Sequence, residues 1–181
     1  MKAVVFLADG FEECEALIVV DILRRAGVET VMASVMDDIQ VDSSRHIKVL
    51  ADAFADEVDY ESTDLVVLPG GRLGVDNLGK SEIVKEKCRE FAANKYLAAI
   101  CAAPSLLAEI GLLEGKKATC HPDVEGQMQG AVLTGESVVT EGNIVTGQAL
   151  GASFDFALEL VRMLVGSEKA EQIVKAICYK K

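Results

Sequence analysis

The start of the chain alternates an apolar run, a helical stretch and a second apolar run. Residues 3–8 contain no polar side chain and are followed by Asp9-Gly10, which predicts a strand that is buried on both faces. Residues 12–26 have helical spacing, and Gly27 suits the left-handed position past the helix end. Residues 28–34 form the next predicted strand. Such a βαβ unit restricts the chain to a parallel sheet with helices on both faces.

Strands and helices continue to alternate along the rest of the chain. Further predicted strands are residues 47–50, 64–68, 97–101 and 118–120, and further predicted helices are residues 82–94, 104–110, 154–165 and 170–177. Residues 138–140 and 144–146 flank Glu141-Gly142-Asn143, a turn signal for an antiparallel hairpin. We therefore expect one domain over residues 1–181, a flavodoxin-like α/β/α sandwich with a mostly parallel central sheet and an appended hairpin.

Composition and charge exclude several classes of partner. Half of the 181 residues are hydrophobic (50%), which is enough apolar material for one buried core. The 29 acidic and 18 basic residues give a net charge of −11, which repels a nucleic-acid backbone or an anionic membrane. No apolar run approaches the ~20 residues of a membrane-spanning helix, and the early acidic residues do not fit a secretory signal. We expect a cytoplasmic protein that binds neither nucleic acid nor membrane.

The five cysteines form an odd set without a C-x-x-C pair, which argues against both a disulfide framework and a zinc site. Cys101 stands out, because it ends an apolar strand and precedes Ala102, Ala103 and the helix-starting Pro104. This pattern is the outline of a nucleophile elbow. A helix N-terminus at the sulfur would lower the pKa of the thiol. From the residues alone, a small buried hydrophobe at a strand end remains the alternative.

Two kinds of side chain are candidates to assist a reactive cysteine. His121 follows the predicted strand 118–120 and could act as a base, or it could be an ordinary loop histidine. Glu12 and Glu15 begin the first helix at the end of the first strand, where acidic residues are favourable in any helix. If one of them lay buried against a thiolate, it would keep its proton and donate a hydrogen bond to the sulfur.

Motifs spread over nearly the whole chain occur in a characteristic order. They are LADGFEECEA at residues 7–16, DILRRAG at 21–27, VLPGG at 67–71, AAICAAP at 98–104, His121-Pro122 and SFDFAL at 153–158. In these motifs the chain resembles the ThiJ/PfpI superfamily, in the branch of the Parkinson-disease-associated protein deglycase and its bacterial relatives. The combination of the glutamate loop with ICAAP is specific to this group.

The resemblance implies roles for three side chains. Cys101 would be the reactive cysteine at the elbow, Glu15 the protonated acid that touches its sulfur, and His121 a nearby helper. Proteolytic members carry a histidine directly after the nucleophile, whereas this chain has Ala102 there. We therefore do not expect a peptidase.

The resemblance also implies how the substrate is bound. The backbone N–H groups of Gly71 and Ala102 would form an oxyanion hole, which needs donors aimed at a developing alkoxide. Gly70 and Arg45 are the further substrate-binding residues that it implies. The chain departs from the branch at Ala149-Leu150-Gly151-Ala152, where relatives usually have Gly-Pro-Gly-Thr, and this change bears on one wall of the pocket.

The implied activity is a cofactor-independent and metal-independent conversion of α-oxoaldehydes, methylglyoxal to lactate and glyoxal to glycolate, with repair of early glycation adducts on proteins or nucleotides. The substrates are small aldehydes or glycated groups. Relatives pair through the first helix and neighbouring loops, and residues 16–23 are very apolar for a helix with one wet face. We therefore expect a homodimer.

Two other functions are compatible with the same residues. Cys101 could oxidise to a sulfinate in an oxidative-stress sensor or chaperone that needs no turnover. A flavodoxin-like binding module is the other alternative, but only Asp9-Gly10 follows the first strand, without the Gly-rich loop that would hold a phosphate.

Overall fold

The structure, a computed structural model, describes residues 1–180. Its centre is a seven-stranded sheet with the strand order β10-β11-β7-β6-β1-β2-β5. These strands are β1 (Lys2–Leu7), β2 (Glu29–Ser34), β5 (Ala53–Phe54), β6 (Leu65–Leu68), β7 (Tyr96–Ile100), β10 (Val138–Glu141) and β11 (Ile144–Gly147). All neighbours pair in parallel except β10 and β11, which form the antiparallel hairpin. The predicted sheet with its added hairpin is confirmed.

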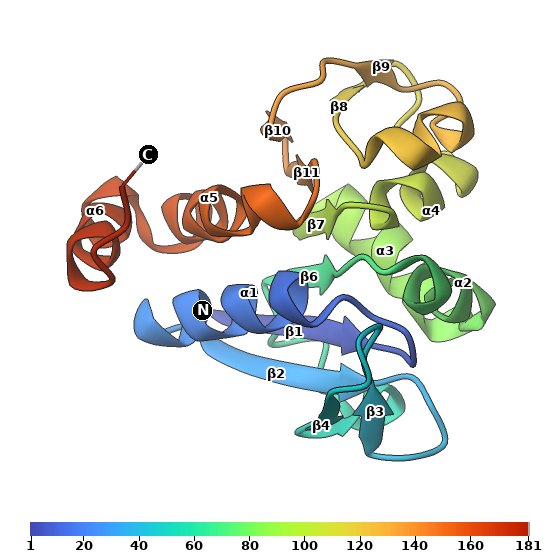
Figure 1. Cartoon of the computed structure of the whole chain (residues 1–181), viewed down its shortest axis with the longest axis horizontal. Coiled ribbons are helices and arrows are strands. Elements are labelled where there is room, and N and C mark those ends of the chain that lie inside the picture. Colours follow the sequence, from blue (N-terminus) through green and yellow to red (C-terminus); the bar gives the residue numbers. More distant parts are fainter. Residues whose placement is uncertain (181) are drawn as a thin grey trace.

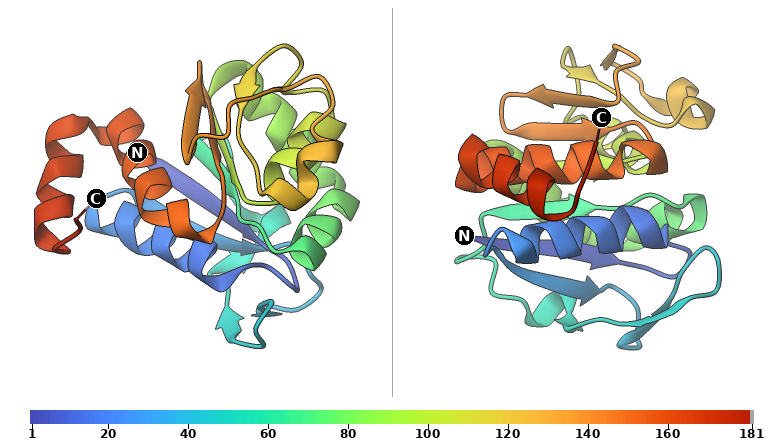
Figure 2. Two further views of the ribbon diagram at one scale, coloured as in Figure 1. Left: turned by 45° about the horizontal axis from the view of Figure 1, so that its top comes forward. Right: turned by 60° about the vertical axis from the view of Figure 1, so that its left-hand side comes forward.

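Helices cover both faces of this sheet (Figure 1). On one face lie α1 (Glu13–Arg25) and α5 (Ser153–Val165), with α6 (Ser167–Ala176) packed against α5. On the other face lie α2 (Arg72–Lys80), α3 (Glu82–Asn94) and α4 (Ala103–Glu109), and Figure 2 shows the three layers. The α/β/α sandwich is thus confirmed. Among residues 1–180 no helix is long and apolar enough to cross a membrane.

Short elements lie outside the central sheet. They are the antiparallel pair β3 (Gln40–Asp42) and β4 (Lys48–Leu50), the parallel pair β8 (Lys117–Ala118) and β9 (Val132–Leu133), and the 3-10 turns η1 (Ala55–Glu57), η2 (Pro122–Gln127) and η3 (Leu150–Ala152). The predicted strand 47–50 therefore belongs to a separate hairpin and not to the sheet. Its Leu50 is 66% exposed, which no central strand of a doubly covered sheet would allow.

Strand β1 explains why residues 3–7 have no polar side chain. Ala3, Val5 and Leu7 face the core under α1 and α5, whereas Val4 and Phe6 face the core under α3 and α4. All five side chains are fully buried. A polar group at any of these positions would need a hydrogen-bond partner that neither core supplies.

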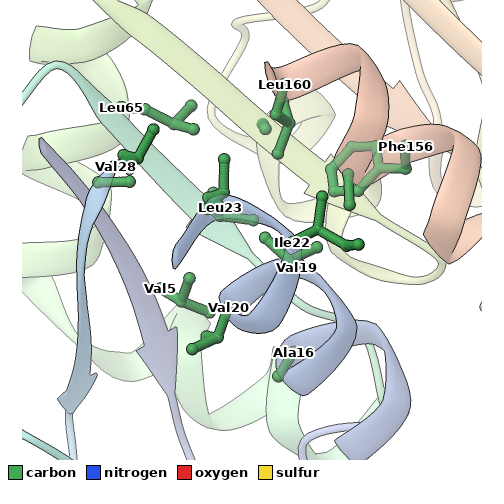
Figure 3. Close-up of a cluster of buried hydrophobic side chains, with 14 of the residues drawn as sticks. Val5, Ala16, Val19, Val20, Ile22, Leu23, Val28, Leu65, Phe156 and Leu160 are labelled. Carbon is green, nitrogen blue, oxygen red and sulfur yellow. The ribbon is translucent and has the colours of Figure 1, made fainter. Parts of the chain in front are cut away.

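Most apolar side chains of helix α1 pack against the sheet and helix α5. Figure 3 shows Val19, Ile22 and Leu23 between the sheet and Phe156 and Leu160 of α5. Five residues of the apolar run 16–23 are thus buried in this chain, whereas Leu17 and Ile18 stay half-exposed. The homodimer stays a prediction that rests on the resemblance.

The Leu23→Ala variant tests this packing. Leu23 is fully buried, so we expect a loss of about 2–5 kcal/mol in the free energy of unfolding, from lost burial and the cavity left behind. The matched control is Leu73→Ala, because Leu73 is 58% exposed and its truncation should change stability by less than about 0.5 kcal/mol. Urea unfolding measures both, and equal losses in the two variants would contradict the packing described here.

Candidate active site

Cys101 occupies a strained turn between β7 and α4. Its φ angle is 67°, in the left-handed region that costs a residue with a Cβ about 1–3 kcal/mol. Two hydrogen bonds hold this turn: the Cys101 N–H donates to the Gly147 carbonyl at 2.9 Å, and the Cys101 carbonyl accepts the His121 N–H at 2.7 Å. The strand, turn and helix expected at Cys101 are all present. The residue lines a cavity of about 400 Å³ at the carboxyl edge of the sheet.

Glu15 reaches the same cavity from the first turn of α1. Its side chain is buried, with 1% of the residue exposed, and it lies beside the Cys101 side chain at Gly70. Its Oε2 accepts the backbone N–H of Gly70 at 2.9 Å. The Glu12 carboxylate caps the helix by accepting the Glu15 N–H at 2.8 Å. Of the two acids at the start of α1, Glu15 is therefore the one that lies against the thiol.

Burial dominates the electrostatics of this pair. It raises the pKa of the Glu15 carboxyl to about 7, the charge of Glu12 adds to this, and hydrogen bonds from Cys101 and Gly70 act in the opposite direction. Burial and the Glu15 charge also raise the pKa of the Cys101 thiol to about 12. Two like charges so close in a poorly hydrated place disfavour each other. Above about pH 7 the pair therefore carries one negative charge, and loss of its second proton is strongly disfavoured.

One expectation about Cys101 is wrong. The start of α4 was expected to make the thiol acidic, but α4 has only seven residues, and burial with an ionised Glu15 raises the pKa of the thiol. The backbone N–H groups of Gly71 and Ala102 lower that pKa. When Glu15 holds the proton, the repulsion is absent and these two donors still stabilise a thiolate. The acidity of the thiol is thus a property of the pair.

The two glycines after β6 let the backbone approach this pair. A Cβ on Gly70 would lie 2.5 Å from the Cys101 Cβ and 2.9 Å from its Sγ, and it would overlap Oε2 of Glu15. Gly71 has a φ of 86°, and a Cβ there would lie 2.7 Å from the Glu12 backbone nitrogen. Larger residues would separate the thiol from its acid or displace the N–H donors.

The other residues implied by the resemblance also surround the cavity. His121 and Arg45 line it, the latter from the turn between β3 and β4. His121 Nδ1 accepts the backbone N–H of Asp123 at 3.2 Å. Gly70 does not line the cavity, but its N–H group donates to Glu15, which does. The residues of the resemblance that line the cavity are Cys101, Glu15, Gly71, Ala102, His121 and Arg45.

Sequence reasoning missed two charged residues of this cavity, Arg72 and Asp123. Arg72 is the first residue of α2, and its Nη2 lies 3.9 Å from Oδ2 of Asp123. A signal was available, because Arg72 directly follows Gly70-Gly71 and Asp123 follows His121-Pro122. The departure from the branch at Ala149-Leu150 also forms part of the wall. Within the described part of the chain, no group of three or more His, Cys, Asp or Glu side chains could hold a metal ion.

Comparison with known proteins identifies the family. Residues 1–163 match the DJ-1/PfpI family. The chain belongs to this family. Protein DJ-1 homolog A of Arabidopsis thaliana is 41% identical over 172 residues, 94% of this chain, although the chain spans only 44% of that relative and 39% of the Arabidopsis homolog B. Protein dj-1beta of Drosophila melanogaster is 35% identical over 179 residues, 97% of this chain and 96% of that protein.

The fold of this DJ-1/PfpI chain has close structural relatives. The structure of oxidized Toxoplasma gondii DJ-1 has a TM-score of 0.95 and 35% identity, and the match covers 99% of both chains. The Caenorhabditis elegans protein named glutathione-independent glyoxalase DJR-1.2 is 27% identical over 173 residues, 94% of this chain and 91% of that protein. The ThiJ/PfpI resemblance and the flavodoxin-like fold are confirmed.

The Gly70→Ala variant tests the close approach at the site. The added methyl group must displace Cys101 or Glu15, so we expect the rate of Cys101 alkylation by iodoacetamide to change by about tenfold or more. The matched control is Gly79→Ala in α2, where a Cβ would lie 3.5 Å from Leu106 in ordinary contact. Alkylation unchanged in both variants would contradict the described geometry.

The raised pKa of Glu15 predicts a pH dependence of stability. An unfolded chain loses this proton near the ordinary value of 4.5, whereas the folded chain keeps it until about pH 7. Between these values the folded state binds more protons, so the free energy of unfolding falls as pH rises. Glu15→Gln removes this contribution, and from about pH 5 to about pH 8 it should gain roughly 2 kcal/mol relative to wild type. Urea unfolding at both pH values measures this, and an equal difference at the two would contradict it.

Proposed function

We propose that the protein converts α-oxoaldehydes into hydroxy acids without a cofactor, for example methylglyoxal into lactate. The observation that carries this proposal is the close approach of the Cys101 and Glu15 side chains at one cavity, where burial raises the pKa of both groups. Such a pair supplies a nucleophile and a proton carrier at one place. The relative named glutathione-independent glyoxalase supports the same class of reaction.

The first step uses the pair in the state with a thiolate and a protonated Glu15. The Cys101 sulfur forms a bond to the aldehyde carbon, and the electron pair of the carbonyl bond moves to its oxygen. The N–H groups of Gly71 and Ala102, which favour negative charge at this sulfur, would then stabilise that oxygen. Glu15 then gives its proton to the oxygen, so the product is a neutral hemithioacetal and an ionised carboxylate.

The second step moves a proton between adjacent carbons. The Glu15 carboxylate removes the proton from the former aldehyde carbon, and the neighbouring carbonyl becomes an enediol as it takes up a proton. Glu15 returns its proton to the second carbon while the hydroxyl on the first carbon loses its proton to water, which gives a thioester of the hydroxy acid, in which one carbon is oxidised and its neighbour reduced. Water hydrolyses the thioester and restores the thiol, so no external oxidant is needed. His121 is available at the cavity to assist proton movement.

Three further parts of this proposal rest on the resemblance. Early glycation adducts on proteins or nucleotides carry the same reactive carbon and are candidate substrates. A cytoplasmic location fits a role with such aldehydes. We also propose the homodimer, which sedimentation at micromolar concentration tests, because a single species of 19.3 kDa would contradict it.

The second candidate function is oxidation sensing by Cys101 without turnover. The observation that favours it is the protonated carboxyl beside the sulfur, which can donate a hydrogen bond to a sulfinate. The related Toxoplasma gondii protein has been described in an oxidized state. A protein that takes up oxygen at Cys101 under peroxide and shows no aldehyde turnover would favour this function over the first.

The Glu15→Gln variant tests the proposed chemistry. Glutamine keeps a hydrogen-bond donor at the sulfur but cannot carry a proton, so methylglyoxal turnover should fall by about 10²–10⁴-fold while alkylation of Cys101 persists. Cys101→Ser should abolish turnover. Glu168→Gln is the matched control, because Glu168 is an acid in the first turn of α6 and does not line the cavity. Normal turnover in Glu15→Gln would overturn the assigned role.

A further inference from the structure

Two hollows meet at a pair of arginines. The cavity that contains Cys101 is about 400 Å³, and a second hollow of about 370 Å³ lies beside it. Both are lined by Ser44, Arg45 and Arg72. A continuous surface therefore leads from the thiol, past two guanidinium groups, into a second space.

These dimensions exceed what methylglyoxal requires. Cavities of roughly 300–1,000 Å³ usually hold ligands of drug-like size, and methylglyoxal fills a small fraction of the first hollow alone. A substrate that uses the surface has further atoms beyond its reactive carbonyl. The side chains shared by the two hollows, Ser44, Arg45 and Arg72, determine which chemical groups those further atoms can form.

Both guanidinium groups are available to a ligand. Arg45 Nη1 donates to the Ser44 carbonyl at 3.3 Å, and within residues 1–180 Arg45 makes no ion pair. Arg72 faces Asp123 at 3.9 Å, but the two side chains are 61% and 70% exposed. A long, exposed pair of this kind contributes little, so a well-placed anion can displace Asp123 from Arg72.

We propose that Arg72, together with Arg45, binds an anionic group of the substrate. This inference rests on the proposed function and names its substrate class: α-oxoaldehydes that carry a carboxylate or a phosphate beyond the reactive carbonyl. Arginine suits this task because its planar fork matches carboxylate and phosphate oxygens. The chain as a whole carries a charge of −11, and Glu12 and Asp123 also line the cavity. Without the two arginines an anion would be repelled here.

The test compares two alkylating agents of nearly equal size, anionic iodoacetate and neutral iodoacetamide. In both reactions the Cys101 sulfur bonds to the methylene carbon and iodide leaves, so no turnover is required. The rate constant for iodoacetate divided by that for iodoacetamide reports the electrostatic potential that an anion meets at the thiol. In Arg72→Ala this ratio should fall by about three- to tenfold, the size of a screened charge interaction near a protein surface.

Further variants separate a specific site from general electrostatics. Arg72→Lys keeps the charge and should retain most of the ratio. Asp123→Asn removes the competing carboxylate and should raise the ratio. Arg89→Ala removes a positive charge from α3, away from both hollows, and should leave the ratio unchanged. An unchanged ratio in Arg72→Ala, or an equal fall in Arg89→Ala, would overturn the inference.

Turnover measurements show whether the site prefers a carboxylate or a phosphate. They also separate failure of the proposed function from failure of the anion site. The probes are methylglyoxal, an α-oxoaldehyde with a terminal carboxylate, and the phosphate ester of hydroxypyruvaldehyde. We expect Arg72→Ala to raise KM for the charged probes several-fold more than for methylglyoxal, and the larger effect identifies carboxylate or phosphate. If no probe is turned over while the alkylation ratio still depends on Arg72, the proposed function fails and the anion site remains. A KM effect equal for all three probes would contradict the inference.

Discussion

Burying a carboxyl group beside a thiol costs free energy, because neither group can ionise without losing the hydration that water would provide. Glu15 and Cys101 meet under this constraint, and the pKa of each is raised. The surrounding backbone offsets part of the cost through the N–H groups of Gly70, Gly71 and Ala102. What remains is a pair that holds one negative charge, which is the state that nucleophilic addition and proton transfer require.

The parallel sheet is what brings these groups together. Strand β1 leads into the helix that carries Glu15, β6 ends at the two glycines, and β7 ends at Cys101. Because parallel strands end at the same edge, residues far apart in the sequence become neighbours there. The left-handed backbone at Cys101 and the missing Cβ of Gly70 then allow contact between thiol and acid. The rest of the fold, with its two covered faces, keeps that edge in place.

The alternation of apolar runs and helical stretches predicted the sandwich and its parallel sheet, but not the edge strand β5 or the separate hairpin of β3 and β4. The sequence did not reveal α2, because Gly74 and Gly79 lower helix propensity, although Gly74 is needed where the Phe11 backbone approaches its Cα. It also gave the wrong direction for the pKa of Cys101, since desolvation and the charge of Glu15 arise only from tertiary contacts. Arg72 was overlooked although it directly follows Gly70-Gly71, because the helix that it begins, α2, was not predicted.

The central claim is that the pair of Glu15 and Cys101 holds a single negative charge near neutral pH. The most direct measurement is a pH titration that follows two signals in the same samples: the carbon NMR shift of the Glu15 carboxyl and the ultraviolet absorbance of the Cys101 thiolate. The Glu15→Gln and Cys101→Ser variants assign each signal to its residue. We expect one ionisation, shared between the two signals, with its midpoint near the Glu15 value of about 7. The second ionisation should come only at much higher pH. A fully formed carboxylate and a fully formed thiolate together below about pH 8 would contradict the account.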